Sequence, residues 1–275
     1  MELALTAIFQ NEAQYLKEWI DFHRQIGFEF FYLFDHFSTD FPEKVLEPYL
    51  TEGIVKLTHW PITYGDVYEW TEVQCLAYER AIHWACGKTK WLAILDVDEF
   101  LFPVEGKLIN ILQDFEEFGG VCVNWQIYGT SNVAKIPEGK KMIATLNFKA
   151  PEAQVANFHV KSIVRPQRVE SLDNAHSLKY KDGFFQVNTK KERFEGCLSP
   201  TIETDLLRIN HYTLRDEHYL MTQKVPRLQK WWPEPTPHLP KKREEWKAKF
   251  ATMNLVEDTI IHRFLNEELD VDLSY

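Results

Sequence analysis

Three carboxylates follow a short apolar run in the middle of the chain. Residues 91–95, WLAIL, are apolar throughout, which is typical of a strand buried on both faces of a parallel sheet. Asp96, Asp98 and Glu99 follow this run. Crowded carboxylates at the end of a buried strand repel one another and lose hydration, and a divalent cation relieves both costs. Residues 96 and 98 lie on one side of an extended chain, so the spacing predicts that Asp96 and Asp98 bind one Mn²⁺ or Mg²⁺ with positions left for a diphosphate.

The same acidic stretch has a simpler interpretation as a solvated strand end that caps the following turn. Asp-x-Asp is short and common, so its spacing alone does not decide between the two. A second such pair, Asp270 and Asp272, follows no apolar run and lies in a polar tail. We expect this second pair to be exposed to solvent.

The N-terminal third of the chain alternates between strand and helix patterns. Apolar stretches predict strands at 3–9, 28–35 and 54–60, and apolar residues at helical spacing predict helices at about 12–26, 42–50 and 68–86. This order is typical of a Rossmann-like parallel sheet, in which ligands bind beyond the carboxyl ends of the strands. The residues expected there, as nucleotide contacts, are Phe9, Asn11, Glu12 and Asp35. Each could equally be a loop or capping residue, and Asn11 in particular could cap the first helix.

Composition narrows the class of protein. The chain has 275 residues, 45% of them hydrophobic, which is enough for a large core, and its formal charge of −10 argues against a nucleic-acid-binding surface. No GxGxxG or P-loop stretch is present. The four cysteines lack a CxxC pair and lie in apolar surroundings, so we expect reduced core residues in a reducing compartment. No leader pattern and no run of eighteen apolar residues occurs, so we expect a soluble, cytoplasmic protein without a transmembrane segment.

Five blocks in chain order resemble glycosyltransferase family 92 and the related family-2-like bacterial enzymes. They cover most of residues 3–230 and read AIFQNEAQYLKEWIDFHRQIGFEFFYLFDHFSTD, KTKWLAILDVDEFLFP, NWQIYGTSN, KSIVRP and LRINHYTLRDEHYL. The resemblance implies a GT-A fold, which is an α/β fold with a mixed, mostly parallel sheet flanked by helices. It also implies a nucleotide-sugar donor, usually a uridine diphosphate (UDP) sugar. Asp96 and Asp98 match the metal-binding Asp-x-Asp (DxD) signature of the family, and Asn11, Glu12 and Asp35 match nucleotide-contacting positions.

By this resemblance the chain is expected to be an inverting, metal-dependent hexosyltransferase that acts on a glycan or lipid-linked acceptor in cell-surface polysaccharide biosynthesis. Animal members carry an N-terminal membrane anchor, which this sequence lacks, so a cytoplasmic enzyme, or one bound peripherally at the inner face of the membrane, is the better match. Two other functions use similar residues. A metal-dependent phosphohydrolase needs more acidic or histidine ligands nearby, and a non-catalytic sugar-nucleotide-binding domain would not keep the metal-binding aspartates.

The second half of the chain supplies further candidate site residues. Predicted strands at 121–130 and 158–166 carry Trp125, which could stack on a sugar ring or fill the core. They also carry two cations, Lys161 and Arg165, which could face a diphosphate or be ordinary surface cations. His211 is the predicted third metal ligand, and His176 is the alternative. An inverting enzyme needs one carboxylate as general base, and the sequence does not choose among Asp173, Glu170 and Glu195.

We expect a GT-A domain at 1–220, with a nucleotide-sugar half at 1–103 and an acceptor half at 104–220, followed by a helical and proline-rich extension at 221–275. The proline-rich stretch predicts an extended strap anchored by Trp231 and Trp232. After it comes a charged segment that could form a helix on an anionic bilayer, although its interleaved acids favour a solvated helix. Its basic and aromatic residues are Lys241, Lys242, Arg243, Trp246, Lys247, Lys249 and Phe250.

Overall fold

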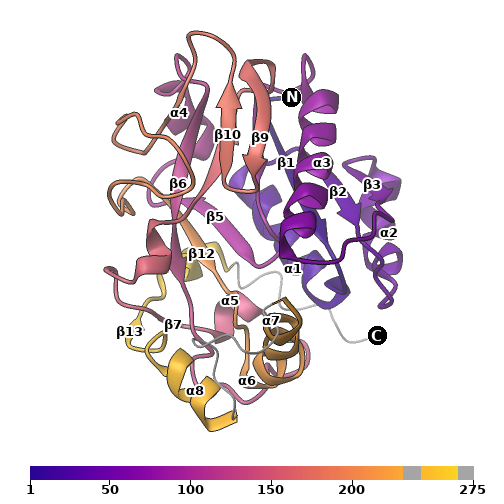
Figure 1. Cartoon of the computed structure of the whole chain (residues 1–275), viewed down its shortest axis with the longest axis vertical. Coiled ribbons are helices and arrows are strands. Elements are labelled where there is room, and N and C mark those ends of the chain that lie inside the picture. The colour runs from indigo at the N-terminus through magenta and orange to yellow at the C-terminus, as the bar shows by residue number, and fades with distance from the viewer. Residues whose placement is uncertain (232–242, 266–275) are drawn as a thin grey trace. The chain divides into compact units, whose positions relative to one another are not determined.

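The computed structural model describes residues 1–231 and 243–265 (Figure 1). They form two compact units. Unit 1 contains residues 1–125 and 155–209, and unit 2 contains residues 126–154 and the described residues from 210 onward. These units do not follow the linear division at residue 220 that the sequence suggests, so the nucleotide and acceptor halves stay a prediction. Trp232, Lys241, Lys242, Asp270 and Asp272 lie outside the described residues.

The alternation of strand and helix predicted for the N-terminal third is confirmed. The elements are β1 (Leu3–Phe9), α1 (Ala13–Ile26), β2 (Phe30–Asp35), α2 (Pro42–Glu52), β3 (Val55–His59), α3 (Val67–Ala85) and β4 (Trp91–Ile94). Local signals set their ends. Gly27 ends α1 in a left-handed conformation, with φ of 114°. The Asp66 side chain accepts hydrogen bonds from the backbone N–H groups of Tyr68 and Glu69 and so caps the start of α3.

The later strands complete one large sheet and a hairpin. They are β5 (Glu99–Pro103), β6 (Gly120–Ile127), β8 (Val160–Val164), β9 (Val169–Asn174), β10 (Ser177–Tyr180), β11 (Gln186–Val187) and β12 (Leu207–His211), with α4 (Leu108–Gln113) and the short turns η1 (Val155–Phe158) and η2 (Pro166–Arg168) between them. β9 and β10 pair as an antiparallel hairpin. β11 pairs with β6.

The large sheet has the strand order β3-β2-β1-β4-β8-β6-β12-β5. Strands β3, β2, β1 and β4 are parallel, whereas β8 runs antiparallel to both β4 and β6. The predicted α/β class, a mixed sheet with helices on its faces, is confirmed. The strand order reverses between β1 and β4, and ligands of open α/β sheets bind beyond the carboxyl ends of the strands at this switch point.

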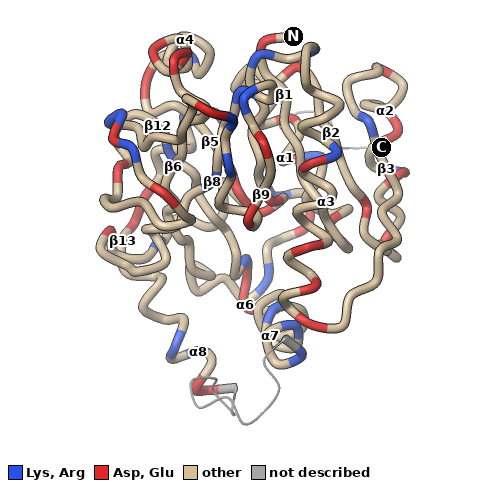
Figure 2. The backbone as a smooth tube through the Cα atoms, turned by 45° about the horizontal axis from the view of Figure 1, so that its top comes forward, with Lys and Arg blue, Asp and Glu red and all other residues tan. Residues whose placement is uncertain are grey.

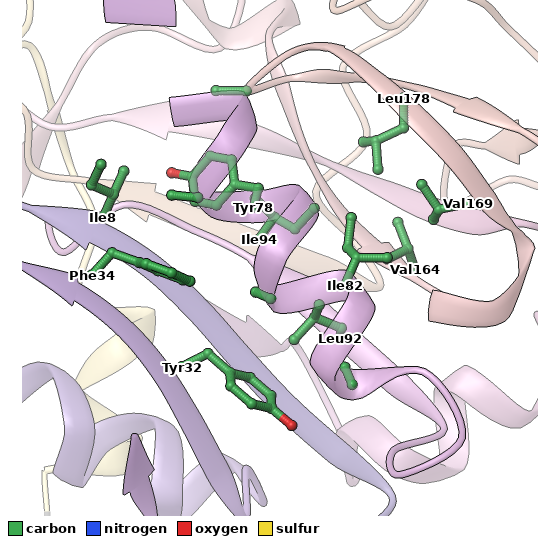
Figure 3. Packing of buried hydrophobic residues seen from close by; sticks show 14 of the residues in the cluster. Ile8, Tyr32, Phe34, Tyr78, Ile82, Leu92, Ile94, Val164, Val169 and Leu178 are labelled. Atoms are coloured by element: carbon green, nitrogen blue, oxygen red, sulfur yellow. The ribbon is translucent and has the colours of Figure 1, made fainter. Parts of the chain in front are cut away.

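Helices cover the two faces of this parallel part of the sheet. Side chains on a strand alternate between faces, so neighbouring residues of β2 point in opposite directions. Tyr32 and Phe34 pack with α3, together with Leu92 and Ile94 of β4 (Figure 3). Phe31 points the other way and contacts Trp19 of α1, with ring centroids 6.0 Å apart. β4 is therefore buried on both faces, as its continuous apolar run predicts.

Unit 2 contains short elements that pack on one another. They are α5 (Met142–Thr145), β7 (Phe148–Lys149), α6 (Glu217–Tyr219), η3 (Leu220–Lys224), α7 (Val225–Trp231), α8 (Arg243–Ala251), β13 (Val256–Glu257) and η4 (Ile260–Phe264). β13 pairs antiparallel with β7. A Cβ on Gly129 would lie 2.0 Å from the Asn254 Oδ1, so this glycine allows a close approach of the C-terminal segment.

The helix α8 does not offer its aromatic residues to a bilayer. Trp246 and Phe250 are buried in a cluster of unit 2 with Leu214, Leu220 and Val225, which corrects the membrane-helix interpretation. Glu244, Glu245, Lys247 and Lys249 are exposed, as expected for a solvated helix. No helix within residues 1–231 and 243–265 combines the length and apolar character needed to cross a membrane. Acidic and basic positions are interspersed along the chain (Figure 2).

All four cysteines carry free thiols, but only one belongs to the core. Cys122 is buried, Cys75 and Cys197 are half-buried, and Cys86 is exposed just after α3. The prediction that all four are core residues is therefore correct for Cys122 alone, and Cys86 departs from it most. Cys86 follows the last turn of the helix, where the apolar pattern has already ended.

Candidate functional site at the carboxyl end of β4

The acidic stretch forms a tight turn between β4 and β5. The Glu99 N–H donates to the Asp96 carbonyl oxygen at 3.1 Å, which closes a four-residue turn. The chain is therefore not extended through 96–98, and that part of the metal-site argument is wrong. The turn forms because the Glu99 carboxylate also accepts the Asp96 N–H at 2.8 Å and because Val97 is buried. Asp96 and Asp98 remain partly exposed at the switch point of the sheet.

Glu99 stabilises the turn from its buried side. Its side chain is fully buried, and Lys161 Nζ lies 3.7 Å from its Oε2. Burial raises the pKa of the Glu99 carboxyl well above its usual value, and Lys161 opposes this rise. Glu99 is therefore a structural acid under the turn, a role that the sequence did not reveal because its spacing is the same as that of an exposed ligand.

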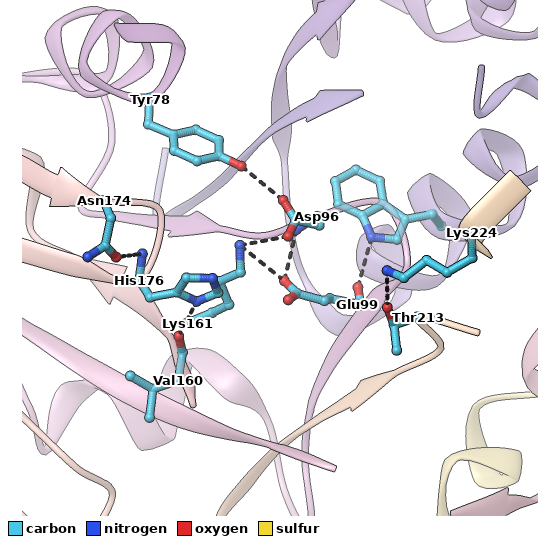
Figure 4. A network of polar contacts seen from close by, with 10 residues as sticks. Tyr78, Asp96, Glu99, Val160, Lys161, Asn174, His176, Thr213 and Lys224 are labelled. Carbon is cyan, nitrogen blue, oxygen red and sulfur yellow. Dashed lines mark hydrogen bonds and ion pairs between the residues drawn. The ribbon is translucent and has the colours of Figure 1, made fainter. Parts of the chain in front are cut away.

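Lys161 lies on the acidic turn and not on the surface. It comes from β8, and its side chain has no exposed area, while its Nζ lies 2.9 Å from Asp96 Oδ2 (Figure 4). Burial acts to lower the pKa of Lys161, but Asp96 and Glu99 outweigh it and the pKa is raised. The Lys161 ammonium therefore faces the carboxylates of the turn, and its contact with a diphosphate stays a prediction.

Tyr78 is a second donor to Asp96 that the sequence analysis did not identify. Its hydroxyl donates to Asp96 Oδ1 at 3.0 Å from the buried face of α3 (Figure 4). Burial acts to raise the pKa of the Asp96 carboxyl, but Lys161 lowers it by more. Asp96 is therefore held as a carboxylate with one protein donor on each oxygen.

Helix α1 holds β5 from the opposite face. Trp19 Nε1 donates to the Glu99 carbonyl oxygen at 2.8 Å. The Leu101 N–H donates to His23 Nε2 at 3.2 Å, so His23 Nδ1 carries the proton and donates to the Trp19 carbonyl oxygen at 2.8 Å. Burial lowers the pKa of His23 to about 3. The neutral imidazole therefore links α1 to the strand that carries Glu99.

A row of aromatic residues continues from Lys161 along the same face of β8 and β6. Val123 pairs with Lys161, so Trp125 lies opposite His159 on the face that carries Lys161. The rings of Trp125 and His159 are stacked with centroids 5.2 Å apart. The His176 ring meets Trp125 edge-on at 5.0 Å. All three side chains are only partly buried.

His176 has the tautomer that a metal ligand or a hydrogen-bond acceptor requires at Nε2. Its Nδ1 lies 2.9 Å from the Val160 carbonyl oxygen, which fixes the proton on Nδ1 and the lone pair on Nε2 (Figure 4). Burial lowers the pKa of His176 to about 3. His211, the other candidate, ends β12 in unit 2, where its carbonyl oxygen accepts the Tyr128 N–H. The choice between these histidines as third metal ligand stays a prediction.

The loops after β1 and β2 are tied to each other. Asn11 Oδ1 accepts the Thr39 N–H at 2.7 Å, and the Asn11 N–H donates to Ser38 Oγ at 2.9 Å. Asn11 does not cap α1, because Asp40 Oδ2 accepts the first helical N–H, that of Ala13, at 2.8 Å. That capping prediction is wrong, since a residue 27 positions away supplies the acceptor.

The other predicted nucleotide contacts lie in or beside these loops. Asp35 Oδ1 accepts the Ser38 N–H at 3.0 Å, and His59 Nδ1 lies 3.6 Å from Asp35 Oδ2. Phe9 and Glu12 are buried, at the end of β1 and at the start of α1. Asn11, Phe37 and Phe41 have φ values of 56°, 55° and 57°, a left-handed conformation that is rare for bulky side chains. The loops are thus held in a strained form, and their contact with a nucleoside stays a prediction.

Arg165 is not brought to the acidic turn. β8 runs antiparallel to β4, with Val164 opposite Leu92, so Arg165 lies beside the amino end of β4. Its guanidinium lies over the Trp91 ring and donates to the Glu116 carbonyl oxygen. The structure places Lys161 near the start of β8 and Arg165 just after its end.

The three candidate bases are exposed side chains. Asp173 pairs with Lys179 at 2.8 Å, Glu195 is 88% exposed, and Glu170 is exposed on β9. The choice of base stays a prediction.

The donor atoms of the turn fit a divalent ion that has other ligands as well. Asp96 and Asp98 supply hard carboxylate oxygens of the kind that Mn²⁺ and Mg²⁺ prefer. Among the residues that the structure describes, no group of three or more His, Cys, Asp or Glu side chains is placed to hold a metal ion. Asp96 and Asp98 alone would leave most coordination positions of such an ion to other ligands.

An acidic turn at the switch point of a Rossmann-like sheet defines an α/β protein with a candidate ligand site beyond β4. The family model of glycosyltransferase family 92 matches residues 5–273, and the chain belongs to this family. It is 26% identical over 220 residues to a glycosyltransferase family 92 protein of Ricinus communis, covering 77% of this chain and 35% of that protein. It is 27% identical over 217 residues to a family 92 protein of Oryza sativa subsp. japonica, covering 76% of this chain and 33% of that protein.

The chain thus spans about a third of the length of these curated relatives. Solved structures are less similar. A mycobacterial protein gives a TM-score of 0.38 at 10% identity, covering 71% of this chain and 67% of that one. The mannosyltransferase Ktr4p of S. cerevisiae gives a TM-score of 0.27 at 10% identity, covering 49% of this chain and 42% of that one.

Proposed function

We propose that the chain is an active glycosyltransferase that moves a hexose from a nucleotide diphosphate donor, a UDP-sugar, to a hydroxyl group of a glycan or lipid-linked acceptor. The observation that carries this proposal is the pair Asp96 and Asp98 on a fixed turn at the switch point between β1 and β4. Family membership adds independent support, because the relatives are named glycosyltransferases.

The donor's diphosphate is the group that the acidic turn would bind through Mn²⁺ or Mg²⁺. Asp98 and the exposed side of Asp96 would hold the ion, which supplies positive charge to the departing diphosphate. The nucleoside would lie against the tied loops after β1 and β2, where Asp35 can accept a hydrogen bond from a base or a ribose. Because these loops are already fixed by Asn11, little conformational entropy is lost on binding.

The acceptor would lie along the aromatic row of Trp125 and His159. Aromatic rings offer a flat apolar surface to the C–H faces of sugars, and this row shares a sheet face with Lys161 and therefore with the acidic turn. Inversion requires one base to remove the proton of the acceptor hydroxyl, for which the candidates are Asp173, Glu170 and Glu195. We propose that the reaction takes place in the cytoplasm, or at the inner face of the membrane, in cell-surface polysaccharide synthesis.

Binding and turnover measurements test the proposal together. Calorimetry with UDP, GDP, CDP and dTDP, each with and without Mn²⁺, identifies the nucleotide. Hydrolysis or transfer from the matching nucleotide sugars is then followed by NMR, which also reports the anomeric configuration of the product. We expect metal-dependent binding of one nucleotide, UDP, and a product of inverted configuration. If no nucleotide binds under either condition, the transferase proposal is wrong.

A further inference from the structure

The acidic turn already contains a cation that belongs to the protein. Asp96 Oδ2 lies 2.9 Å from Lys161 Nζ, and Asp96 Oδ1 accepts the Tyr78 hydroxyl at 3.0 Å. The same ammonium lies 3.7 Å from Glu99 Oε2. Each oxygen of Asp96 therefore has a donor within the fold, and the metal ligand expected first from the sequence is engaged before any ion arrives (Figure 4).

Lys161 cannot act as a surface cation toward a ligand in this conformation. Its side chain has no exposed area, and the carboxylates of Asp96 and Glu99 lie on its ammonium. A buried ammonium persists only where such partners offset its desolvation. The role that remains for Lys161 is to balance charge inside the turn.

We propose that Lys161 is an internal counter-ion that occupies Asp96 in the donor-free protein, so that a divalent ion binds strongly only together with the donor's diphosphate. The inference rests on the proposed metal-dependent use of a nucleotide sugar. A divalent ion alone meets Asp98 and the remaining coordination capacity of Asp96. With a diphosphate, two or more further oxygen ligands complete its coordination. Metal and donor binding are then coupled, and each strengthens the other by the same factor.

Replacing Lys161 by a neutral side chain of similar length should allow a divalent ion to bind strongly without the diphosphate. In Lys161→Met, Asp96 and Glu99 lose their counter-ion. A divalent ion can then balance the negative charge of the turn in the absence of nucleotide. We expect the variant to bind Mn²⁺ in the absence of nucleotide at least about tenfold more tightly than the wild type does. We also expect Mn²⁺ to raise the melting temperature of this variant and to leave that of the wild type nearly unchanged.

The test is a Mn²⁺ titration followed by electron paramagnetic resonance, with the full chain and with UDP as the nucleotide probe. For the wild type we expect weak binding of Mn²⁺ alone and at least about tenfold tighter binding with UDP present. Wild-type affinity that is already high without UDP, or Lys161→Met affinity that does not increase, would overturn the inference. If UDP does not bind under any condition, the proposed function fails instead, and the Lys161→Met result still reports on the counter-ion.

Two further variants separate charge from other effects. Lys149→Met is the matched control, because Lys149 is also nearly buried beside a carboxylate, that of Asp258 at 3.1 Å in unit 2. It should lose stability without gaining affinity for Mn²⁺.

Tyr78→Phe removes the neutral donor of Asp96 and keeps the ammonium. Its gain in Mn²⁺ affinity should therefore be no more than about fivefold, the effect of one neutral hydrogen bond. An equal gain in Tyr78→Phe and Lys161→Met would show that charge is not the cause. If Lys161→Met does not fold, the wild-type and Tyr78→Phe titrations still decide.

Discussion

The stability of the fold should decrease as the pH falls below neutrality, because His23 is then protonated in the unfolded chain but not in the folded one. The imidazole is buried and neutral, with Nδ1–H donating to the Trp19 carbonyl and Nε2 accepting the Leu101 N–H. Its pKa is lowered from 6.5 to about 3 in the folded protein because of burial. Between these two values the unfolded chain binds a proton that the folded chain does not. The stabilising contribution is therefore complete above pH 6.5 and is lost as the pH falls toward 3.

The size of the effect follows from the two pKa values. At pH 5 the unfolded histidine is almost fully protonated and the folded one is not, so folding stability is about 2 kcal/mol lower than at pH 7 from this group alone. His176 has a pKa lowered to about 3 as well and adds a loss of the same sign. The contribution of His23 must therefore be isolated by substitution.

His23→Gln is the variant that isolates it, because the glutamine amide can both donate and accept a hydrogen bond but does not titrate. Urea unfolding of the wild type and of His23→Gln, followed by tryptophan fluorescence at pH 7, 6 and 5, gives the dependence of stability on pH for each. We expect the loss between pH 7 and pH 5 to be smaller in the variant by about 2 kcal/mol. The same loss in both proteins would refute the assignment of His23 as a buried neutral link between α1 and β5.

Three further predictions concern the proposed ligands. Asp35→Ala should raise the dissociation constant of UDP about tenfold or more in calorimetry, the loss of one charged hydrogen bond, and an unchanged value would leave Asp35 as a turn residue only. If His211 is the third metal ligand, His211→Ala should weaken Mn²⁺ binding in the presence of UDP and reduce its pH dependence between about pH 5 and 7, while His176→Ala should not; the opposite result would exchange their roles. Trp125→Ala should raise the KM for the acceptor with little change in UDP affinity, and Trp125→Phe should keep this KM closer to the wild-type value. Weaker UDP binding in Trp125→Ala would contradict the acceptor assignment.

The first half of the fold was predictable because its signals are local. The apolar run Trp91–Ile94 identifies a buried strand, Gly27 ends a helix, and Asp66 caps one. The position of the acidic stretch at the carboxyl end of β4 followed from the same run. Its conformation did not follow, because an extended chain and a closed turn have the same spacing and the choice depends on the burial of Glu99.

The contacts that complete the site connect residues far apart in the sequence. Lys161 reaches Asp96 across 65 residues, and Trp19 reaches Glu99 across 80. Both contacts depend on strand order and register, which hydrophobic periodicity does not determine. The same limit explains Arg165, which directly follows the strand that carries Lys161 but lies at the opposite end of β4 once the antiparallel pairing is known.

The central claim is that Asp98 on the β4–β5 turn supports metal-dependent sugar transfer. The most direct measurement compares the wild type with Asp98→Asn for release of UDP and transfer of sugar from a UDP-sugar, in Mn²⁺ and after chelation. Asparagine is nearly isosteric, so circular dichroism and the melting temperature should stay unchanged. We expect wild-type activity to require Mn²⁺ and Asp98→Asn to lose about 100-fold or more of it. Full activity in Asp98→Asn, with the fold intact, would contradict this account of the site.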